Sequence, residues 1–209
     1  MEQDTIIQLY KEYVLSHKTR PSSVYTFMQE QGEEEKSFYA HFASFSALEQ
    51  QLFYSYFENT ISRLAASAEY QEYDSLQKIL AFFYTWLEVM QAERSLVKFM
   101  HQQANYSLFS LTPSYMATTV EPFQEHIRKL LKYGIDDGQV ADRFFVTRYY
   151  KQGFWAQARL ILNYWLKDNS PNFEKTDAMV EKTLRLAFDV IEPNTLDSGF
   201  DLARFLWRG

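Results

Sequence analysis

The sequence of 209 residues predicts an all-α protein. Only five Pro and six Gly interrupt it, whereas Leu, Ala, Gln, Glu, Lys and Met, which favour helices, are plentiful. Apolar residues recur at spacings of three and four rather than alternating. Since 46% of the residues are hydrophobic, the chain can bury a core, as one medium domain or as a small domain fused to a larger one.

The chain carries no cysteine, which excludes disulfides and thiol chemistry. Its first residues show no basic stretch followed by an apolar core. No later run is long enough and free enough of charge to span a bilayer. The sequence therefore predicts a cytoplasmic protein without a membrane span.

An apolar stripe predicts the first helix. The stripe comprises Ile6, Ile7, Tyr10, Tyr13 and Val14. Segment 18–21 breaks this helix, and Ser22 or Ser23 can cap a second one. Gly32 is expected to end the second helix, because glycine readily takes the left-handed C-terminal position. Residues 33–35, all Glu, then open a third helix, whose dipole favours each carboxylate by about 0.3–1 kcal/mol.

Helical spacing continues through the rest of the chain. The run over 76–90 is apolar on nearly every side and so belongs in a core. Segment 105–113 is predicted to be a break, ended by Thr112 as a cap and Pro113 at the first helical position. Further helices are predicted over 47–68, 94–103, 114–133 and 173–191.

Glycines and prolines predict where the second half of the chain turns. Gly134 is expected to cap the preceding helix, and Gly138 to form the tight corner of the turn. Residues 139–167 fit either one long helix weakened at Gly153 or two helices in series. Residues 170–171, Ser-Pro, then interrupt the pattern before the last predicted helix.

Residues 22–48 resemble the helix-turn-helix of a TetR-type regulator, with no insertion between its short helix, Gly turn and second short helix. The matching positions are Ser23, Val24, Phe27, Gly32, Tyr39, Phe42 and Leu48. This resemblance implies a TetR-like all-α fold. It implies a three-helix domain over 1–47, a linking helix over 47–68, and a ligand-binding and dimerisation domain over 69–209.

In TetR-type proteins two long C-terminal helices pack against their copies as a four-helix interface. The helices over 154–167 and 175–191 resemble that pair in order and length. The resemblance thus implies a homodimer through residues 154–191. Both helices carry apolar residues on more than one face, and we expect Trp165 and Leu184 to lie in the interface.

The resemblance also implies double-stranded DNA as a partner. The expected contact residues are Ser23, Lys36, Ser37, Tyr39 and His41. Two features depart from the family, since the turn ends in three Glu and Phe45 stands where a phosphate-binding Lys is usual. Residues 1–62 hold nine Asp or Glu against four Lys or Arg. This balance opposes DNA binding, which depends on cations at phosphates.

Aromatic residues make up 18% of the chain and concentrate over 82–109 and 144–155. Most are expected in the core, yet a helical domain around an apolar cavity would use the same residues, with a few polar groups for orientation. The residues expected to line a site for an apolar small-molecule effector are Phe83, Trp86, Phe99, Gln103, Tyr106, Phe109, Phe145, Arg148, Tyr149 and Trp155.

Catalytic and metal-binding patterns are missing from the sequence. The four His residues are scattered, without a second ligand at a spacing that would build a metal site on one helix face. No Gly-rich phosphate loop or nucleophile motif occurs, so we expect neither a cofactor nor an enzyme.

Two functions therefore stay open. One is a ligand-responsive transcription regulator that binds operator DNA as a homodimer, with DNA binding weakened or lost. The other is a carrier of an apolar or lipid-like molecule that uses the same fold without binding DNA.

Overall fold

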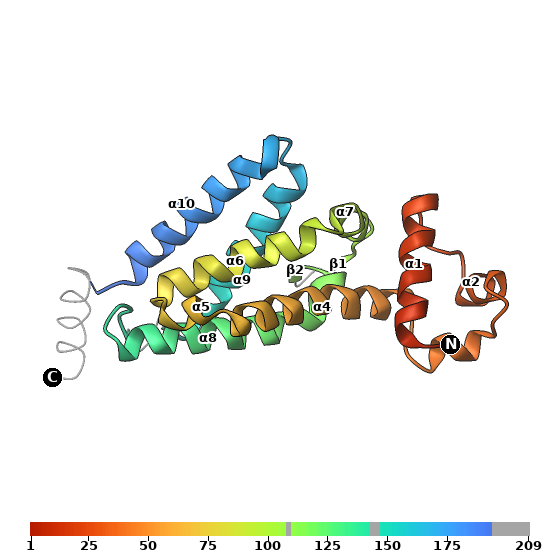
Figure 1. Ribbon diagram of the computed structural model, residues 1–209, viewed down its shortest axis with the longest axis horizontal. Coiled ribbons are helices and arrows are strands. Elements are labelled where there is room, and N and C mark those ends of the chain that lie inside the picture. Colours follow the sequence, from red (N-terminus) through yellow and green to blue (C-terminus); the bar gives the residue numbers. More distant parts are fainter. Residues whose placement is uncertain (108–109, 143–146, 194–209) are drawn as a thin grey trace. The chain divides into compact units, whose positions relative to one another are not determined.

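The structure, a computed structural model, describes residues 1–107, 110–142 and 147–193. Over these residues the regular secondary structure is helical apart from one short two-stranded antiparallel sheet, which confirms the all-α prediction (Figure 1). The elements are α1 (Gln3–His17), α2 (Val24–Glu30), α3 (Glu35–Tyr39), α4 (Phe45–Ala66), α5 (Ala68–Glu72), α6 (Ser75–Gln91), α7 (Arg94–Gln102), β1 (Tyr106–Ser107), β2 (Ser110–Pro113), η1 (Ser114–Thr119), α8 (Val120–Asp136), α9 (Thr147–Lys167), η2 (Pro171–Phe173) and α10 (Glu174–Ile191).

The chain forms two compact units, each made of two separate stretches. Unit 1 combines Met1–Asn59 with Glu88–Val120, and unit 2 combines Thr60–Leu87 with the chain from Glu121 onwards. Helices α4 and α6 each contribute residues to both units. The functional division expected from the sequence, at residues 47 and 69, stays a prediction. No helix among the described residues has both the length and the apolar character needed to cross a membrane.

Unit 1 has an aromatic core that joins its first four helices. The α1 stripe is buried at Ile6, Tyr10 and Val14, as its spacing predicts. Phe45 at the start of α4 stacks on Tyr10 with ring centroids 5.3 Å apart. It also meets the edges of Phe27 and Phe38 at 5.5 and 5.2 Å. Such pairs add about 0.5–1.5 kcal/mol each beyond burial. The side chain that replaces the family's lysine at position 45 therefore helps to hold α1, α2, α3 and α4 together.

The segment predicted as a break over 105–113 contains an antiparallel hairpin, with β1 paired to β2. The prediction that the next helix starts at residue 114 was wrong, because η1 comes first and α8 begins only at Val120. Pro122 explains the delay. It has no N–H to donate and its ring would clash with the carbonyl four residues earlier, so it is tolerated only in the first turn of a helix.

The end of α8 corrects the prediction for Gly134, which is not a cap. The helix continues to Asp136, and Gly134 is buried within it. A Cβ at this position would lie 2.8 Å from both Ser75 Cβ and Val140 Cγ2. Only a glycine therefore allows α8 to approach the start of α6 so closely. Gly138 takes the left-handed conformation instead, with φ of +75°.

Helix α9 begins at Thr147, later than predicted, and then runs without a break through Gly153. The single-helix alternative is thus correct for this stretch. Ala141 in the preceding segment donates its backbone N–H to the carbonyl of Ile191 at 2.8 Å. This bond ties Ala141 to the end of α10.

Candidate functional site

The α2–α3 motif is built by local hydrogen bonds. Ser23 Oγ accepts a hydrogen bond from the Thr26 backbone N–H at 3.1 Å and so caps the first turn of α2. At the other end Gly32 has φ of +72°, and the N–H groups of Gly32 and the next residue donate to carbonyls in the last turn of α2. This is the Schellman arrangement, in which glycine takes the left-handed position. The predicted cap and turn are both confirmed.

Two of the five expected DNA contacts are largely exposed on α3. The side chain of Lys36 is 80% exposed, and Tyr39 is 53% exposed. Ser23 is exposed but occupied as a cap. Ser37 is half-buried and donates to a neighbouring Glu at 3.1 Å, while His41 Nε2 lies 3.1 Å from a backbone carbonyl of the N-terminus. The motif thus presents one aromatic and one cationic side chain for recognition.

Carboxylates neutralise most of the positive charge around this motif. Three of the four Lys or Arg in residues 1–62 form ion pairs at 2.6 Å within unit 1, and these pairs are Lys11 with Glu93, Arg20 with Glu49 and Lys36 with Glu34. The hydrogen bond that Lys36 donates to Glu34 and the negative charge of that carboxylate both raise the pKa of Lys36. Since phosphate contacts need available cations, the ion pairs reinforce the acidic balance of the sequence.

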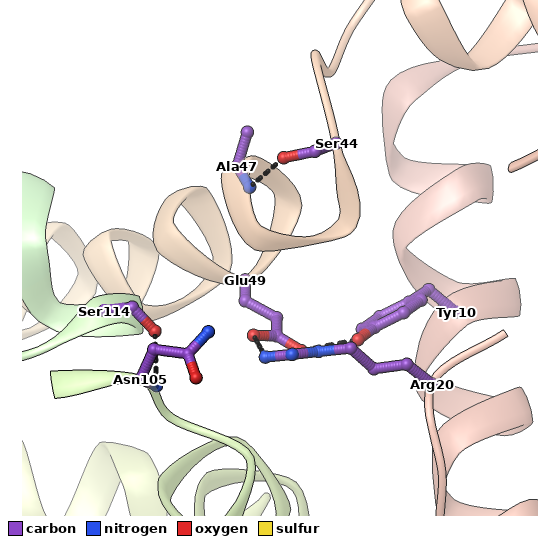
Figure 2. A network of polar contacts seen from close by, with 7 residues as sticks. All are labelled: Tyr10, Arg20, Ser44, Ala47, Glu49, Asn105 and Ser114. Atoms are coloured by element: carbon purple, nitrogen blue, oxygen red, sulfur yellow. Dashed lines mark hydrogen bonds and ion pairs between the residues drawn. The ribbon is translucent and has the colours of Figure 1, made fainter. Parts of the chain in front are cut away.

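A buried carboxylate ties α4 to α1 and to the loop that leads into the motif (Figure 2). Glu49 in α4 is fully buried and accepts hydrogen bonds from Tyr10 Oη at 2.6 Å, Arg20 Nε at 2.8 Å and Arg20 Nη2 at 2.6 Å. Burial and the neighbouring Glu49 together raise the pKa of Tyr10, so its hydroxyl keeps its proton and donates. The network joins α1, the α1–α2 loop and α4.

The role of Glu49 was not predicted from the sequence, although its position among apolar residues of α4 is informative. The residue stands between Phe45 and Phe53, four positions from each, on the inner stripe of α4. A charged residue at such a position is rarely buried without a partner. Its partners, however, lie 29 and 39 residues away in the chain and could not be named from spacing alone.

Unit 2 gathers several of the expected effector residues into an aromatic cluster. Phe83 and Trp86 on α6, and Trp155 on α9, are all buried. Phe123 on α8 lies at their centre, with its ring centroid 6.2, 5.9 and 5.1 Å from those three rings. His126, one turn further along α8, packs against the ring of Phe82, with centroids 5.1 Å apart. Burial lowers the pKa of His126 to about 4, so its imidazole is neutral near pH 7.

The other expected effector residues are not part of this cluster. Phe99 is buried in unit 1 and Gln103 is exposed there. Tyr149 on α9 is exposed. Phe109 and Phe145 lie outside the described residues, as do the side chains of Tyr106 and Arg148. Phe123 and His126 were not predicted, although Phe123 lies on the buried stripe of α8 and His126 packs against Phe82. Among the described residues no group of acidic or imidazole side chains could hold a metal ion.

Helices α9 and α10 form a helical hairpin. The residues that it buries and exposes are not those expected for the dimer interface. Trp165 and Leu184 are fully buried within the single chain, so their assignment to a dimer interface was wrong. Besides Tyr149, four other large apolar residues are exposed among the described residues of the two helices, in pairs spaced four apart. They are Leu160 and Tyr164 on α9, and Leu186 and Val190 on α10. The physical reason is that Trp165 and Leu184 lie on the sides of the two helices that pack within the chain itself.

The turn of this hairpin is held by Asp168. Its carboxylate accepts hydrogen bonds from the backbone N–H and hydroxyl of Thr176, at 2.9 and 2.6 Å, and from both groups of Ser170. These bonds hold the pKa of Asp168 well below its usual range. Two residues with positive φ, Asn172 and Phe173, complete the turn. A surface hollow of about 750 Å³ lies beside it, between the turn and the exposed residues of α9.

Comparison with known proteins agrees with the fold. Residues 78–206 match the family described as "Tetracyclin repressor-like, C-terminal domain". A protein described as a TetR family transcription regulator from Shewanella sp. PV-4 is 17% identical, with a TM-score of 0.61 over 93% of this chain and 100% of that one. The fatty acid degradation regulator FadR from Bacillus halodurans is 14% identical, with a TM-score of 0.63 over 89% of this chain and 94% of that one.

No curated protein sequence matches the chain. The two solved structures share its fold at low identity, which confirms the TetR-like architecture expected from residues 22–48. The family match is independent of that motif, because it begins at residue 78 and covers more than half of the chain. The chain belongs to the TetR family of transcription regulators.

Proposed function

We propose that this transcription regulator binds operator DNA as a homodimer and releases it when an apolar small molecule binds. The observation that supports DNA binding best is the intact α2–α3 motif, with its capped first helix, its glycine turn, and Tyr39 and Lys36 exposed on α3. Because a transcription regulator works beside the DNA, we also propose that it is cytoplasmic.

The protein should have an unusually low affinity for DNA duplexes that do not contain its operator sequence. Only one of the four cations in residues 1–62, Lys18, has no carboxylate partner among the described residues. Exposed carboxylates at Glu34 and Glu35 add repulsion beside α3. We therefore expect binding to mixed duplex DNA weaker than the ~10⁻⁴–10⁻⁶ M usual at physiological salt.

Changing Glu34 and Glu35 to Lys should strengthen duplex binding. The change removes the carboxylate that pairs with Lys36 and adds two cations beside α3. Each new phosphate contact should steepen the dependence of log K on log salt by roughly one unit. Fluorescence anisotropy with a labelled mixed duplex at several salt concentrations measures both quantities.

The matched control changes two exposed carboxylates of α5, Glu69 and Glu72, to Lys and so alters net charge equally. If the control binds as well as the α3 variant, net charge rather than the motif governs binding. Tight binding by the unmodified protein to a random duplex at physiological salt would contradict the expected repulsion.

For the homodimer, we propose the outer face of the α9–α10 hairpin as the interface. It exposes Leu160, Tyr164, Leu186 and Val190, a set of large apolar side chains that the chain itself leaves uncovered. A two-fold interface brings the same face of each copy together, so both helices would contribute.

Replacing Leu186 with Glu should weaken this dimer, because the interface would bury a charge in each copy. Sedimentation velocity at micromolar concentration should show the species shift from dimer to monomer mass. Leu15→Glu serves as the control, since Leu15 is an exposed leucine in unit 1. If the Leu186 variant keeps the dimer mass, the outer face of the α9–α10 hairpin is not the dimer interface.

For the effector, we propose that an apolar molecule binds at the aromatic cluster of Phe83, Trp86, Phe123 and Trp155. These rings provide an apolar wall, and the neutral imidazole of His126 adds one polar group without a charge. Since the cluster contains two tryptophans, binding should shift their fluorescence and raise the melting temperature of the protein. A library of fatty acids and aromatic compounds that changes neither signal would contradict this assignment.

The alternative function is a carrier of an apolar molecule that no longer binds DNA. The observation that favours it is the internal pairing of Lys11, Arg20 and Lys36. The two proposals differ in one measurable respect. A regulator loses duplex affinity when the apolar ligand is added, whereas a carrier binds the ligand but shows no duplex affinity to lose.

A further inference from the structure

Glu93 stands at the corner between α6 and α7, yet its side chain does not cap the helix that follows. It occupies the N-cap position of α7 without a side-chain capping bond. Its carboxylate turns to two other helices of unit 1. Oε1 pairs with Lys11 Nζ of α1 at 2.6 Å, and Oε2 accepts a hydrogen bond from the hydroxyl of Tyr56 on α4. One side chain therefore bridges α1, α4 and the α6–α7 corner.

The bridge lies among closely packed helices of unit 1. Helices α1 and α7 contact each other directly, and the ring of Tyr56 is buried. Burial raises the pKa of Tyr56, as does its hydrogen bond to Glu93, so the hydroxyl remains a donor. A carboxylate that accepts from two donors on different helices restrains both, because either motion would leave a polar group without its partner.

Glu93 differs from Glu49 in how easily its bonds can break. Glu49 is fully buried, and losing its partners would strand a charge away from water. The side chain of Glu93 is 31% exposed and that of Lys11 is 13% exposed, so water can solvate both groups if they separate. The ion pair of Lys11 with Glu93 can therefore open at a lower cost than the ion pair of Arg20 with Glu49.

We propose that the Lys11–Glu93–Tyr56 bridge is a releasable latch that fastens the two helices flanking the α2–α3 motif to the α6–α7 corner. Helix α6 is one continuous element from Ser75 to Gln91, and its last residues lead directly into this corner. A displacement along α6 therefore reaches Glu93 two residues after the helix ends. The latch exists whether or not DNA binds, but its role as a transmitter rests on the regulator function proposed above.

The latch is tested by hydrogen exchange on the full chain with Glu93→Gln and Lys11→Met, which keep the size of each side chain. The control is Glu12→Gln, an exposed carboxylate next to Lys11 on the same helix, with the same change in charge as the Glu93 variant. Amides of α1 should exchange about five- to tenfold faster in both test variants, with α9 and α10 unchanged and the control like the original protein.

Unchanged exchange in α1 of the Glu93 and Lys11 variants would overturn the latch. Equal acceleration in α1 and α10 would also overturn it, because it would mean a general loss of stability. Duplex binding of the same variants separates the two proposals. If α1 loosens as expected but no variant binds any duplex, the latch stands and the regulator function fails.

Discussion

Replacing Glu49 with Ala is expected to destabilise the protein by about 3–5 kcal/mol, because it breaks a buried ion pair and leaves the partners behind. The guanidinium of Arg20, whose side chain is only 27% exposed, would lose both of its hydrogen bonds. The buried hydroxyl of Tyr10 would lose its acceptor. Urea unfolding followed by circular dichroism measures the loss, with the slope of the transition as a check on two-state behaviour.

The control for this prediction is Glu58→Ala, an exposed glutamate on the same helix, which should change stability by less than about 1 kcal/mol. A second variant replaces both charges, with Glu49→Leu and Arg20→Met. Since hydrophobic pairs often substitute well for buried ion pairs, it should recover much of the loss. A loss below about 1 kcal/mol in Glu49→Ala would mean that the network contributes little.

Replacing Trp86 with Ala should cost about 3–5 kcal/mol, as expected for truncation of a large aromatic side chain in a core. Trp86 is almost fully buried and contacts Phe82 and Phe123, with ring centroids 5.5 and 5.9 Å away. Both ring contacts and the buried area are lost together, and a cavity remains. Thermal unfolding should show a melting temperature several degrees lower, and the fluorescence of the three remaining tryptophans, Trp155 among them, should change.

The matched control is Tyr84→Ala, two residues earlier on α6, where the ring is partly exposed and its hydroxyl donates to the backbone carbonyl of Asp177 at 3.4 Å. That change should cost much less than the loss of Trp86. If the two variants were equally stable, the cluster would be loosely packed. Loose packing would itself favour a ligand site there, since the missing contacts could then be supplied by a bound molecule.

The parts of the fold that sequence could predict are those fixed by local chemistry. Ser23 and Gly32 determine the ends of α2 through bonds to residues only a few positions away, so their roles were visible in the sequence. The stripe of α1 is equally local. Pro122 was also readable in principle, because its missing N–H and its ring limit where α8 can start.

Other features depend on neighbours distant in sequence and could not be read in advance. In the sequence Gly134 has the features of a helix cap. Its actual role depends on its close approach to Ser75, a residue several helices earlier in the chain. Trp165 and Leu184 show that the partner of an apolar helix face also cannot be predicted from the sequence alone. Periodicity identifies an apolar face but does not say whether it is covered by the chain itself or by a second copy.

The discontinuous makeup of unit 1 bears on the order in which the protein assembles during synthesis. The bonds of Arg20 and Tyr10 to Glu49 span 29 and 39 residues, so they can form once α4 has left the ribosome. The bond from Lys11 to Glu93 spans 82 residues and must wait for the α6–α7 corner. A nascent chain should therefore hold a structured N-terminal head well before unit 1 is complete, with Lys11 still in water.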